Sequence, residues 1–287
     1  MKYLIIGSKG QLGSHFCKVF NQNGFNYTGM DIDTIDITDL KSVNDIFDTV
    51  KPDIVINCAA YNLVEDAEKN SAPALAVNER GVRNLAEVCE KNNTFLVHYG
   101  TNYVFDGKKG TPYTETDKTN PINEYGKSKL AGENAIKEVM QSNYLILRTS
   151  WLYGEGIQNF IYKFLKRISE GKELVGTIDD IATPTSTRIL VDLTLRSLDS
   201  NLRGTYHAVN SGSASRWDWA KEISILIGKD IKIKKCKIDS FNLLAKVPKD
   251  AILDNSKISK DLNIQIPNWK DELKQFITEQ NYFDLKF

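Results

Sequence analysis

The sequence has no excess of charge of either sign: Lys and Arg together number 37, and Asp and Glu together also number 37. A chain with zero net charge has no overall attraction for nucleic acid or for an anionic membrane surface, although a local basic pocket for phosphates is compatible with it. No apolar run approaches the roughly 18 residues that a membrane span needs. We therefore expect a protein that binds neither nucleic acid nor a membrane.

Cysteine is scarce, and its spacing excludes two common roles. No two cysteines form a CxxC pair, which argues against a zinc ribbon or a redox dithiol and favours buried thiols in a reducing compartment. The apolar run at Tyr3–Ile6 is too short for a signal peptide. We expect a cytoplasmic protein without a metal site. The four cysteines are Cys17, Cys58, Cys89 and Cys236.

The first half of the chain alternates short β-branched runs with longer amphipathic segments. Strands without internal polar alternation, separated by helices, indicate a parallel sheet that is covered on both faces. The sequence therefore predicts an α/β fold with a Rossmann-like doubly wound parallel sheet. The expected strands are Lys2–Ile6, Asn26–Met30, Ile54–Asn57, Phe95–Tyr99 and Tyr144–Arg148, and the expected helices are Gln11–Gln22, Leu40–Val50, Ser71–Lys91 and Glu124–Ser142.

The rhythm changes after residue 150, where helices become more frequent than strands. We expect a first domain over residues 1–150 and a smaller lobe over residues 151–287, from which some segments return to the first sheet. No internal repeat or low-complexity linker separates the two. The expected helices are Asn159–Glu170, Val191–Leu202, Arg216–Ile227 and Trp269–Thr278, and the expected strands are Glu173–Val175, Gly204–His207 and Lys229–Lys237.

Three glycines lie between the first expected strand and the first expected helix, at Gly7, Gly10 and Gly13. Their spacing is GxxGxxG, one residue wider at its start than the commoner GxGxxG. The early glycines allow a tight turn and a close approach to a pyrophosphate, and the last lets helix and strand pack closely. The helix N-terminus adds amide donors. The pattern predicts dinucleotide binding, although a plain strand-to-helix turn also favours glycine.

Asp31 follows the second expected strand, where an acidic residue usually holds the adenosine ribose hydroxyls. This position favours NADH. Lys9, inside the glycine turn, is a counter-signal because a basic residue there could pair with a 2′-phosphate, although it could equally be an exposed loop lysine. We slightly favour NADH and keep NADPH as the alternative.

Tyr125 and Lys129 are four residues apart at the start of an expected helix and therefore share one face. A neighbouring ammonium lowers the pKa of a phenol from about 10 toward the working range, so that Tyr125 could protonate an alkoxide. Lys129 could also hold the nicotinamide ribose. Thr101 lies just past the strand at Phe95–Tyr99, at the edge where such sheets bind ligands, and its hydroxyl could bond a substrate carbonyl.

The YxxxK spacing alone is not specific. It also occurs at Tyr162/Lys166 and Tyr282/Lys286, where the surface of an amphipathic helix is the simpler interpretation. Tyr125 differs in its order along the chain, after the glycine turn and Thr101 and before the YLILR strand.

Together these segments resemble the dTDP-4-dehydrorhamnose reductases, a family of extended short-chain dehydrogenases. The resemblance covers most of the chain and is far more specific than any single motif. The segments that carry it are GQLG at 10–13, DIT at 36–38, PDIVINCAAY at 52–61, VNERGVRNLA at 77–86, TNYVFDG at 101–107, NEYGKSKLAGE at 123–133, LRTSWLYG at 147–154, DDIATPT at 179–185, GTYHAVNSGSAS at 204–215 and IPNWKDEL at 266–273.

The resemblance implies that NADH or NADPH reduces the C4 ketone of a nucleotide-linked 4-keto-6-deoxy sugar, with dTDP-4-dehydro-L-rhamnose giving dTDP-L-rhamnose for surface polysaccharide. A homodimer is one option. Thr101, Tyr125 and Lys129 would be catalytic. The cofactor would contact Gly7, Gly10, Gln11, Leu12, Gly13, Asp31, Asp36, Ile37, Ala59, Ala60, Tyr61, Tyr125 and Lys129, and the substrate would contact Val64, Thr101, Asn102, Tyr103 and Trp151.

The chain departs from the family pattern near the expected substrate. Relatives usually read STDYVF, whereas this chain has Gly100 and Asn102 at the first and third positions. The usual IGSPT and the late RP-x-x-S stretch are also altered, at 181–185 and 246–251. His15 stands where some relatives have a magnesium-binding glutamate. Candidate cations for the diphosphate are Arg188, Lys246 and Lys249, each of which could instead be solvated surface charge.

These departures keep three alternatives open. One is a reductase of a different nucleotide sugar. Another is a non-catalytic NAD(P)-binding regulatory subunit, against which the intact Thr101, Tyr125 and Lys129 argue. The last is an epimerase or dehydratase, although a dehydratase would want an acidic pair beside the threonine, and Asn102 supplies none.

Overall fold

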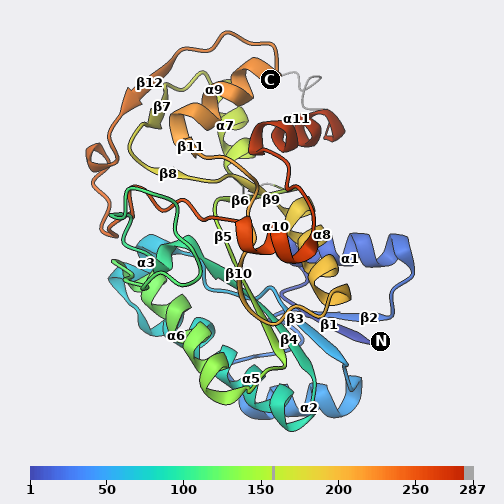
Figure 1. Cartoon of the computed structure of the whole chain (residues 1–287). Coiled ribbons are helices and arrows are strands. Elements are labelled where there is room, and N and C mark those ends of the chain that lie inside the picture. Colours follow the sequence, from blue (N-terminus) through green and yellow to red (C-terminus); the bar gives the residue numbers. More distant parts are fainter. Residues whose placement is uncertain (157–158, 281–287) are drawn as a thin grey trace.

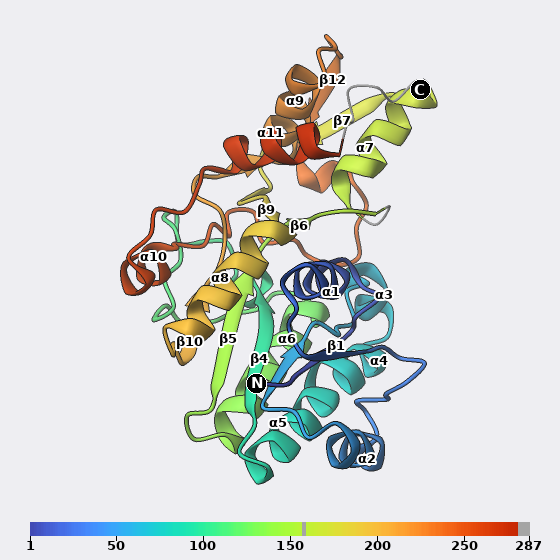
Figure 2. The same cartoon turned by 90° about the vertical axis from the view of Figure 1, so that its right-hand side faces the viewer.

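A parallel sheet of six strands organises the computed structural model, which describes residues 1–156 and 159–280. Its order is β10-β5-β4-β3-β1-β2, and a smaller lobe lies above it (Figure 1, Figure 2). This arrangement confirms the expected α/β fold class. The strands are β1 (Tyr3–Ile6), β2 (Tyr27–Met30), β3 (Ile54–Asn57), β4 (Phe95–Thr101), β5 (Tyr144–Thr149) and β10 (Gly204–His207).

Helices cover both faces of this sheet. Because successive strand residues point to opposite faces, Ile5 and Ile56 join one core while Leu4 and Val55 join the other. The first core is closed by α1 (Gln11–Asn23), α8 (Thr187–Asp199) and α10 (Ser256–Leu262). The second is closed by α2 (Leu40–Val50), α5 (Val82–Lys91) and α6 (Glu124–Val139).

The segment expected as one helix at Ser71–Lys91 consists of three pieces. These are α4 (Ala72–Leu75), the π-helical turn η1 (Ala76–Gly81) and α5. The wider turn brings Asn78 against α6, where a Cβ on Gly132 would overlap the Asn78 carbonyl oxygen. Such π turns are common at functional sites, and this one delivers Asn78 to the site described below. The short helix α3 (Val64–Lys69) was not expected.

The smaller lobe has its own core. Its buried residues include Phe164, Trp219, Trp269 and Phe276. The expected strand at Lys229–Lys237 is shorter than predicted, and α8 begins earlier than expected because the Ser186 side chain caps it by accepting from the Ile189 N–H. The elements are β6 (Leu152–Tyr153), α7 (Phe160–Ser169), β7 (Leu174–Thr177), β8 (Ile181–Ala182), β9 (Thr185–Ser186), β11 (Ala214–Ser215), α9 (Arg216–Leu226), β12 (Ile233–Cys236), the 3-10 turn η3 (Ile238–Ser240) and α11 (Trp269–Glu279).

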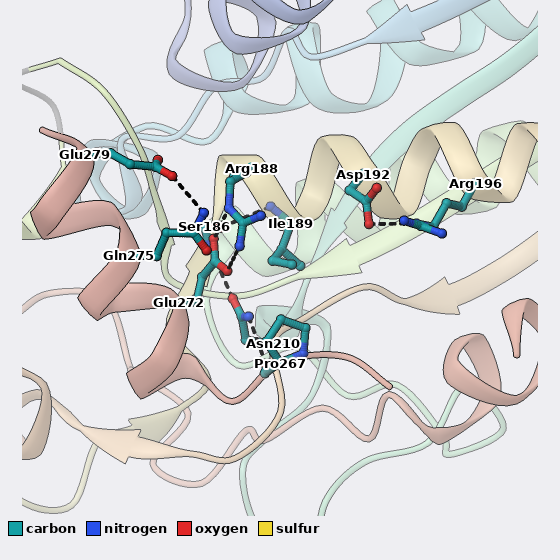
Figure 3. Close-up of polar contacts among 10 residues, drawn as sticks. All are labelled: Ser186, Arg188, Ile189, Asp192, Arg196, Asn210, Pro267, Glu272, Gln275 and Glu279. Atoms are coloured by element: carbon teal, nitrogen blue, oxygen red, sulfur yellow. Dashed lines mark hydrogen bonds and ion pairs between the residues drawn. The ribbon is translucent and has the colours of Figure 1, made fainter. Parts of the chain in front are cut away.

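A buried carboxylate joins the last helix to α8. Figure 3 shows the carboxylate of Glu272, on α11, turned toward Ser186 and Arg188 at the start of α8. The Ser186 hydroxyl donates to Glu272 Oε1 at 2.6 Å, and Arg188 Nε donates to the same oxygen at 2.8 Å. Glu272 is 1% exposed. Because a buried carboxylate is stable only with such partners, this contact fixes the lobe against a helix of the main sheet.

Within the described part of the chain, no helix is both long enough and apolar enough to span a bilayer.

Candidate active site

The turn between β1 and α1 leaves no room for side chains at two of its glycines. A Cβ on Gly7, whose φ is +79°, would lie 2.7 Å from the Ala59 backbone nitrogen, and a Cβ on Gly13 would overlap the Gly7 carbonyl oxygen. Gly10 precedes α1 and offers no side chain to cap it. The Gln11 side-chain nitrogen is buried without a hydrogen-bond partner among the described residues. Free donors at a helix N-terminus fit a pyrophosphate.

Leu12, also expected along the cofactor, is 7% exposed and its side chain lies in the core between α1 and the sheet. Only its backbone can therefore face a bound nucleotide.

Asp31 holds the glycine turn in place. Its Oδ2 accepts from the Lys9 backbone N–H at 2.7 Å, and its Oδ1 accepts from the Ile32 N–H at 2.8 Å. The Lys9 ammonium pairs with Asp33 at 2.5 Å. The charge of Lys9 is thus already engaged, which weakens the argument that it awaits a 2′-phosphate.

Asp36 and Ile37 make internal contacts in the segment after β2. Asp36 Oδ1 accepts from the backbone N–H and the hydroxyl of Thr38, at 2.9 Å and 2.8 Å. Ile37 is 5% exposed, and its side chain contacts Gly81, where a Cβ would lie 2.7 Å from Ile37 Cγ1. The side chain of Ile37 is a core residue, so any contact with an adenine would come from the surrounding backbone.

Asn78 holds the segment Ala59–Tyr61, which follows β3. Its Oδ1 accepts from the Tyr61 N–H at 2.9 Å, and its Nδ2 donates to the Tyr61 carbonyl at 3.0 Å and to the Ser128 hydroxyl at 2.9 Å. One buried amide therefore joins the expected cofactor segment to α6, which carries Tyr125 and Lys129. The sequence reasoning did not identify Asn78, because its role depends on the π turn.

Thr101 and Tyr125 meet at the carboxyl end of β4. Thr101 is the last residue of that strand, and its hydroxyl, which donates to Asn102 Oδ1 at 3.4 Å, lies close enough to the Tyr125 hydroxyl to lower the pKa of the phenol. The Tyr125 hydroxyl also donates to Asn62 Oδ1 at 3.4 Å. The helix that carries Tyr125 is capped by Asn123, and a Cβ on Gly126 would overlap the Tyr103 carbonyl oxygen. This close approach sets Tyr125 beside Thr101.

The electrostatics of this group differ from the expectation. Burial raises the pKa of Tyr125 to about 12, and the hydrogen bond with Thr101 offsets only part of this rise. The prediction that Lys129 lowers the pKa of the phenol is therefore wrong for this arrangement. Burial also lowers the pKa of Lys129 to about 8, although Glu133 opposes the change. Lys129 Nζ lies 3.5 Å from His98 Nε2.

Asn102 and Tyr103 form the 3-10 turn η2 (Asn102–Val104) directly after Thr101. Asn102 is 3% exposed, and its Nδ2 donates to the Ala251 carbonyl at 3.2 Å. The Tyr103 ring packs edge-on against Tyr125, with 5.7 Å between centroids. The amide at position 102 thus ties the catalytic turn to the late segment at 246–251, two places where the chain departs from the family pattern.

The other departure, Gly100, lies against a buried ion pair. A Cβ there would overlap Glu133 Oε1 and lie 2.8 Å from Arg148 Cγ. Any side chain at this position would have to displace that pair.

Trp151 is part of an aromatic and cationic cluster that sequence reasoning missed. Its indole stacks on Trp219 with 5.8 Å between centroids, and the Arg216 guanidinium lies 3.6 Å from the centre of its ring. Arg216 also pairs with Asp180 at 3.5 Å. Nothing in the sequence marked Arg216, since an arginine at a helix start is usually a solvated charge. Val64, the remaining expected substrate residue, begins α3.

Two of the three cations expected for the diphosphate are paired with carboxylates. Arg188 pairs with Glu272, and Lys249 pairs with Asp239 at 2.7 Å. The Lys246 carbonyl accepts from Asn123 Nδ2 at 2.7 Å, at the start of α6. Arg216 is a cation that contacts an expected substrate residue, Trp151.

Two further sequence features within the described residues, the Tyr162/Lys166 pair and His15, lie away from this group. Tyr162 and Lys166 are on α7 in the smaller lobe, and Tyr282/Lys286 lies outside the described residues. His15 Nδ1 lies 2.8 Å from the Thr187 hydroxyl. Over residues 1–156 and 159–280, no three His, Cys, Asp or Glu side chains gather closely enough to hold a metal ion.

A glycine turn that fits a dinucleotide and a Thr–Tyr–Lys group at the edge of a doubly wound sheet define an oxidoreductase of the extended short-chain dehydrogenase class. Residues 1–282 match the family model described as the RmlD substrate binding domain, and the chain belongs to that family.

Solved structures and curated proteins agree with this assignment. The chain is similar to a dTDP-4-dehydrorhamnose reductase of Clostridium acetobutylicum, with 36% identity, a TM-score of 0.93, and coverage of 98% of this chain and 100% of that one. The Bacillus anthracis dTDP-4-dehydrorhamnose reductase in complex with NADP is 32% identical, with a TM-score of 0.93 and coverage of 97% and 99%. The dTDP-4-keto-6-deoxy-D-glucose reductase of Streptomyces niveus is 35% identical over 80% of each chain.

Proposed function

We propose that this protein reduces the C4 ketone of dTDP-4-dehydro-L-rhamnose to give dTDP-L-rhamnose, with NADH or NADPH as the reductant. The observation that carries the proposal is the approach of the Thr101 and Tyr125 hydroxyls at the carboxyl end of β4, the same edge of the parallel sheet at which the glycine turn follows β1. Membership of the RmlD family and the named reductases among its relatives support the substrate class.

Different residues of the site would bind the cofactor, orient the ketone and supply the proton that its reduction needs. A reduced nicotinamide supplies the hydride when it is bound. Gly7, Gly10 and Gln11 would hold its pyrophosphate, and Asp31 its adenosine ribose. Thr101 orients the sugar carbonyl through its hydroxyl, and Tyr125 gives its proton to the oxygen that becomes an alcohol. Burial of Tyr125 keeps this proton in place until negative charge develops beside it.

The cofactor preference remains a slight preference for NADH. Asp31 and Asp33 place two carboxylates next to the glycine turn, which disfavours a 2′-phosphate, and Lys9 is already paired with Asp33. The NADP-bound relative from Bacillus anthracis supports NADPH as the alternative.

A second candidate is a reductase of another nucleotide sugar. The buried Asn102 and the Arg216–Asp180 pair beside Trp151 favour it, because they change the polarity near the expected sugar. The related dTDP-4-keto-6-deoxy-D-glucose reductase of Streptomyces niveus acts on a different sugar according to its name. We regard a non-catalytic regulatory subunit as less consistent with the intact Thr101 and Tyr125.

One assay separates these functions. Purified protein is mixed with NADH or NADPH and a panel of nucleotide-linked 4-keto sugars, and absorbance of the reduced nicotinamide is followed while products are resolved by chromatography. Stoichiometric oxidation with dTDP-4-dehydro-L-rhamnose supports the proposal. A changed sugar without net oxidation indicates an epimerase, and no change with any sugar indicates the regulatory subunit. Light scattering tests the homodimer, and cell fractionation tests the cytoplasmic location.

A further inference from the structure

His98 lies in β4 beside Lys129 and is 1% exposed. Its two ring nitrogens face different partners. Nε2 lies 3.5 Å from Lys129 Nζ, and Nδ1 lies 3.2 Å from Asn57 Nδ2. In a neutral imidazole one nitrogen donates and the other accepts, so these neighbours decide where the proton is.

Asn57 determines which ring nitrogen of His98 carries the proton. Its Oδ1 accepts from the Ala59 backbone N–H at 3.1 Å, so its NH2 group faces His98. The opposite orientation of the amide would set that NH2 group against the Ala59 N–H and leave two donors facing each other. Asn57 is 1% exposed, so solvent cannot compensate for the mismatch. His98 Nδ1 must therefore accept, and the ring proton is on Nε2.

The Nε2–H of His98 points at the amine of Lys129. Burial and the neighbouring Lys129 both lower the pKa of His98 well below its usual range, so the ring is neutral. An ammonium has three donors and no lone pair, whereas an uncharged amine can accept. The contact at 3.5 Å is therefore favourable only when Lys129 is uncharged.

Charged groups around the Lys129 amine come from α6 and β5, and among the described residues the hydrogen-bond partner given for the amine is His98. From α6, Glu133 favours the charged lysine, but Arg148 on β5 holds both of its carboxylate oxygens at 2.7–3.1 Å. Tyr125 is neutral, and from β3 the neighbour of His98 is the uncharged Asn57. Lys129 itself is 3% exposed.

We propose that His98 is a positioning residue that holds the uncharged amine of Lys129 through its Nε2–H, so that Lys129 can return a proton to Tyr125 after each reduction. This inference rests on the proposed function. The sugar oxygen takes the Tyr125 proton, and the resulting phenolate takes a proton from the Lys129 ammonium. The amine that remains accepts from His98 until a solvent proton recharges it. One solvent proton is consumed per ketone reduced, and His98 stays neutral throughout.

Two substitutions of similar polarity distinguish the role of His98 Nε2 from that of His98 Nδ1. In His98→Gln the side-chain amide reaches the place of Nε2, and in His98→Asn it reaches only the place of Nδ1. We expect His98→Asn to lower kcat about ten-fold and to move the alkaline limb of the kcat–pH profile upward by about one unit, because an amine without this donor is more basic. His98→Gln should retain most of the wild-type profile, and cofactor affinity should be unchanged in both. Two variants that follow the wild-type profile, or that shift equally, would overturn the proposal.

A measurement on the unmutated protein covers the case in which the variants do not fold, or in which the protein proves not to be a reductase. The chain has only three histidines, so long-range ¹H–¹⁵N NMR can assign each ring. We expect His98 to carry its proton on Nε2 across the range from pH 6 to about 9, since burial keeps it neutral. A proton on Nδ1 would overturn the proposal whatever the substrate is.

Discussion

Arg148 of β5 holds both carboxylate oxygens of Glu133 on α6, and the two residues are 2% and 0% exposed. This buried pair joins the helix that carries Tyr125 and Lys129 to the strand beside β4. It also lies directly against Gly100. The geometry of the active site therefore depends on a contact that lies behind the reacting groups.

Glu133→Gln should destabilise the protein strongly. It leaves the Arg148 guanidinium buried without a counter-charge, which costs about 3 kcal/mol in the free energy of unfolding. Urea unfolding at pH 7 measures this loss. Asp45→Asn breaks the exposed pair with Lys41 and should cause no measurable change. Equal effects of the two substitutions would contradict the importance of the buried pair.

Tyr125→Phe should reduce turnover by at least about 100-fold, because it removes the proton donor while leaving the ring in place. Cofactor affinity, measured by fluorescence titration, should hardly change. Tyr162→Phe is the matched control, since Tyr162 and Lys166 share the same spacing on α7. Retained turnover in Tyr125→Phe would remove this residue from its proposed role.

Lys129→Met should stabilise the cofactor-free protein at neutral pH, in a pH-dependent way. The folded pKa of about 8 lies below the unfolded value of about 10.4, so the unfolded chain binds more protons between these values and the stability of the wild type rises with pH there. The penalty for burying the charge is on the order of 3 kcal/mol below pH 8 and is relieved toward pH 10.4. Urea unfolding from pH 7 to pH 10 should therefore show the two proteins converging. A constant difference would argue against a charged, buried Lys129.

Asp31→Ala should weaken NADH binding about ten-fold and NADPH binding less, because the ribose hydroxyls lose a charged acceptor. Asp33→Ala is the matched comparison. It releases Lys9 from its ion pair and should improve NADPH binding a few-fold while leaving NADH binding unchanged. Calorimetry with both cofactors measures the four affinities. Equal losses of NADH and NADPH in Asp31→Ala would refute the preference for NADH.

Sequence patterns were sufficient for the strands of the sheet and for α1, α2 and α6, because each of these segments carries a local apolar pattern. The segment at Ser71–Lys91 shows a structure that the sequence pattern does not predict. Its helical pattern is continuous, yet the chain inserts a π turn so that Asn78 can reach Tyr61 and pack against Gly132. Local periodicity contains no information on that approach.

The candidate catalytic residues were also identifiable, since Thr101, Tyr125 and Lys129 appear in the order that a doubly wound sheet brings together. Their electrostatics were not. The expectation that Lys129 lowers the pKa of Tyr125 was based only on the spacing of two residues on one helix. Burial of Tyr125 is the larger effect, and it raises the pKa of Tyr125 to about 12. Desolvation depends on everything that surrounds a group, which spacing cannot give.

The sequence by itself determined the parallel sheet, the glycine turn and the residues that would carry the chemistry, because each of these depends on residue type and local order. Only the tertiary structure decided that His98 lies against Lys129, that Arg148 engages Glu133, and that Arg216 covers Trp151. The physical reason is that these contacts join residues from different strands and helices, and their energy depends on burial from water, which exists only once the chain has folded.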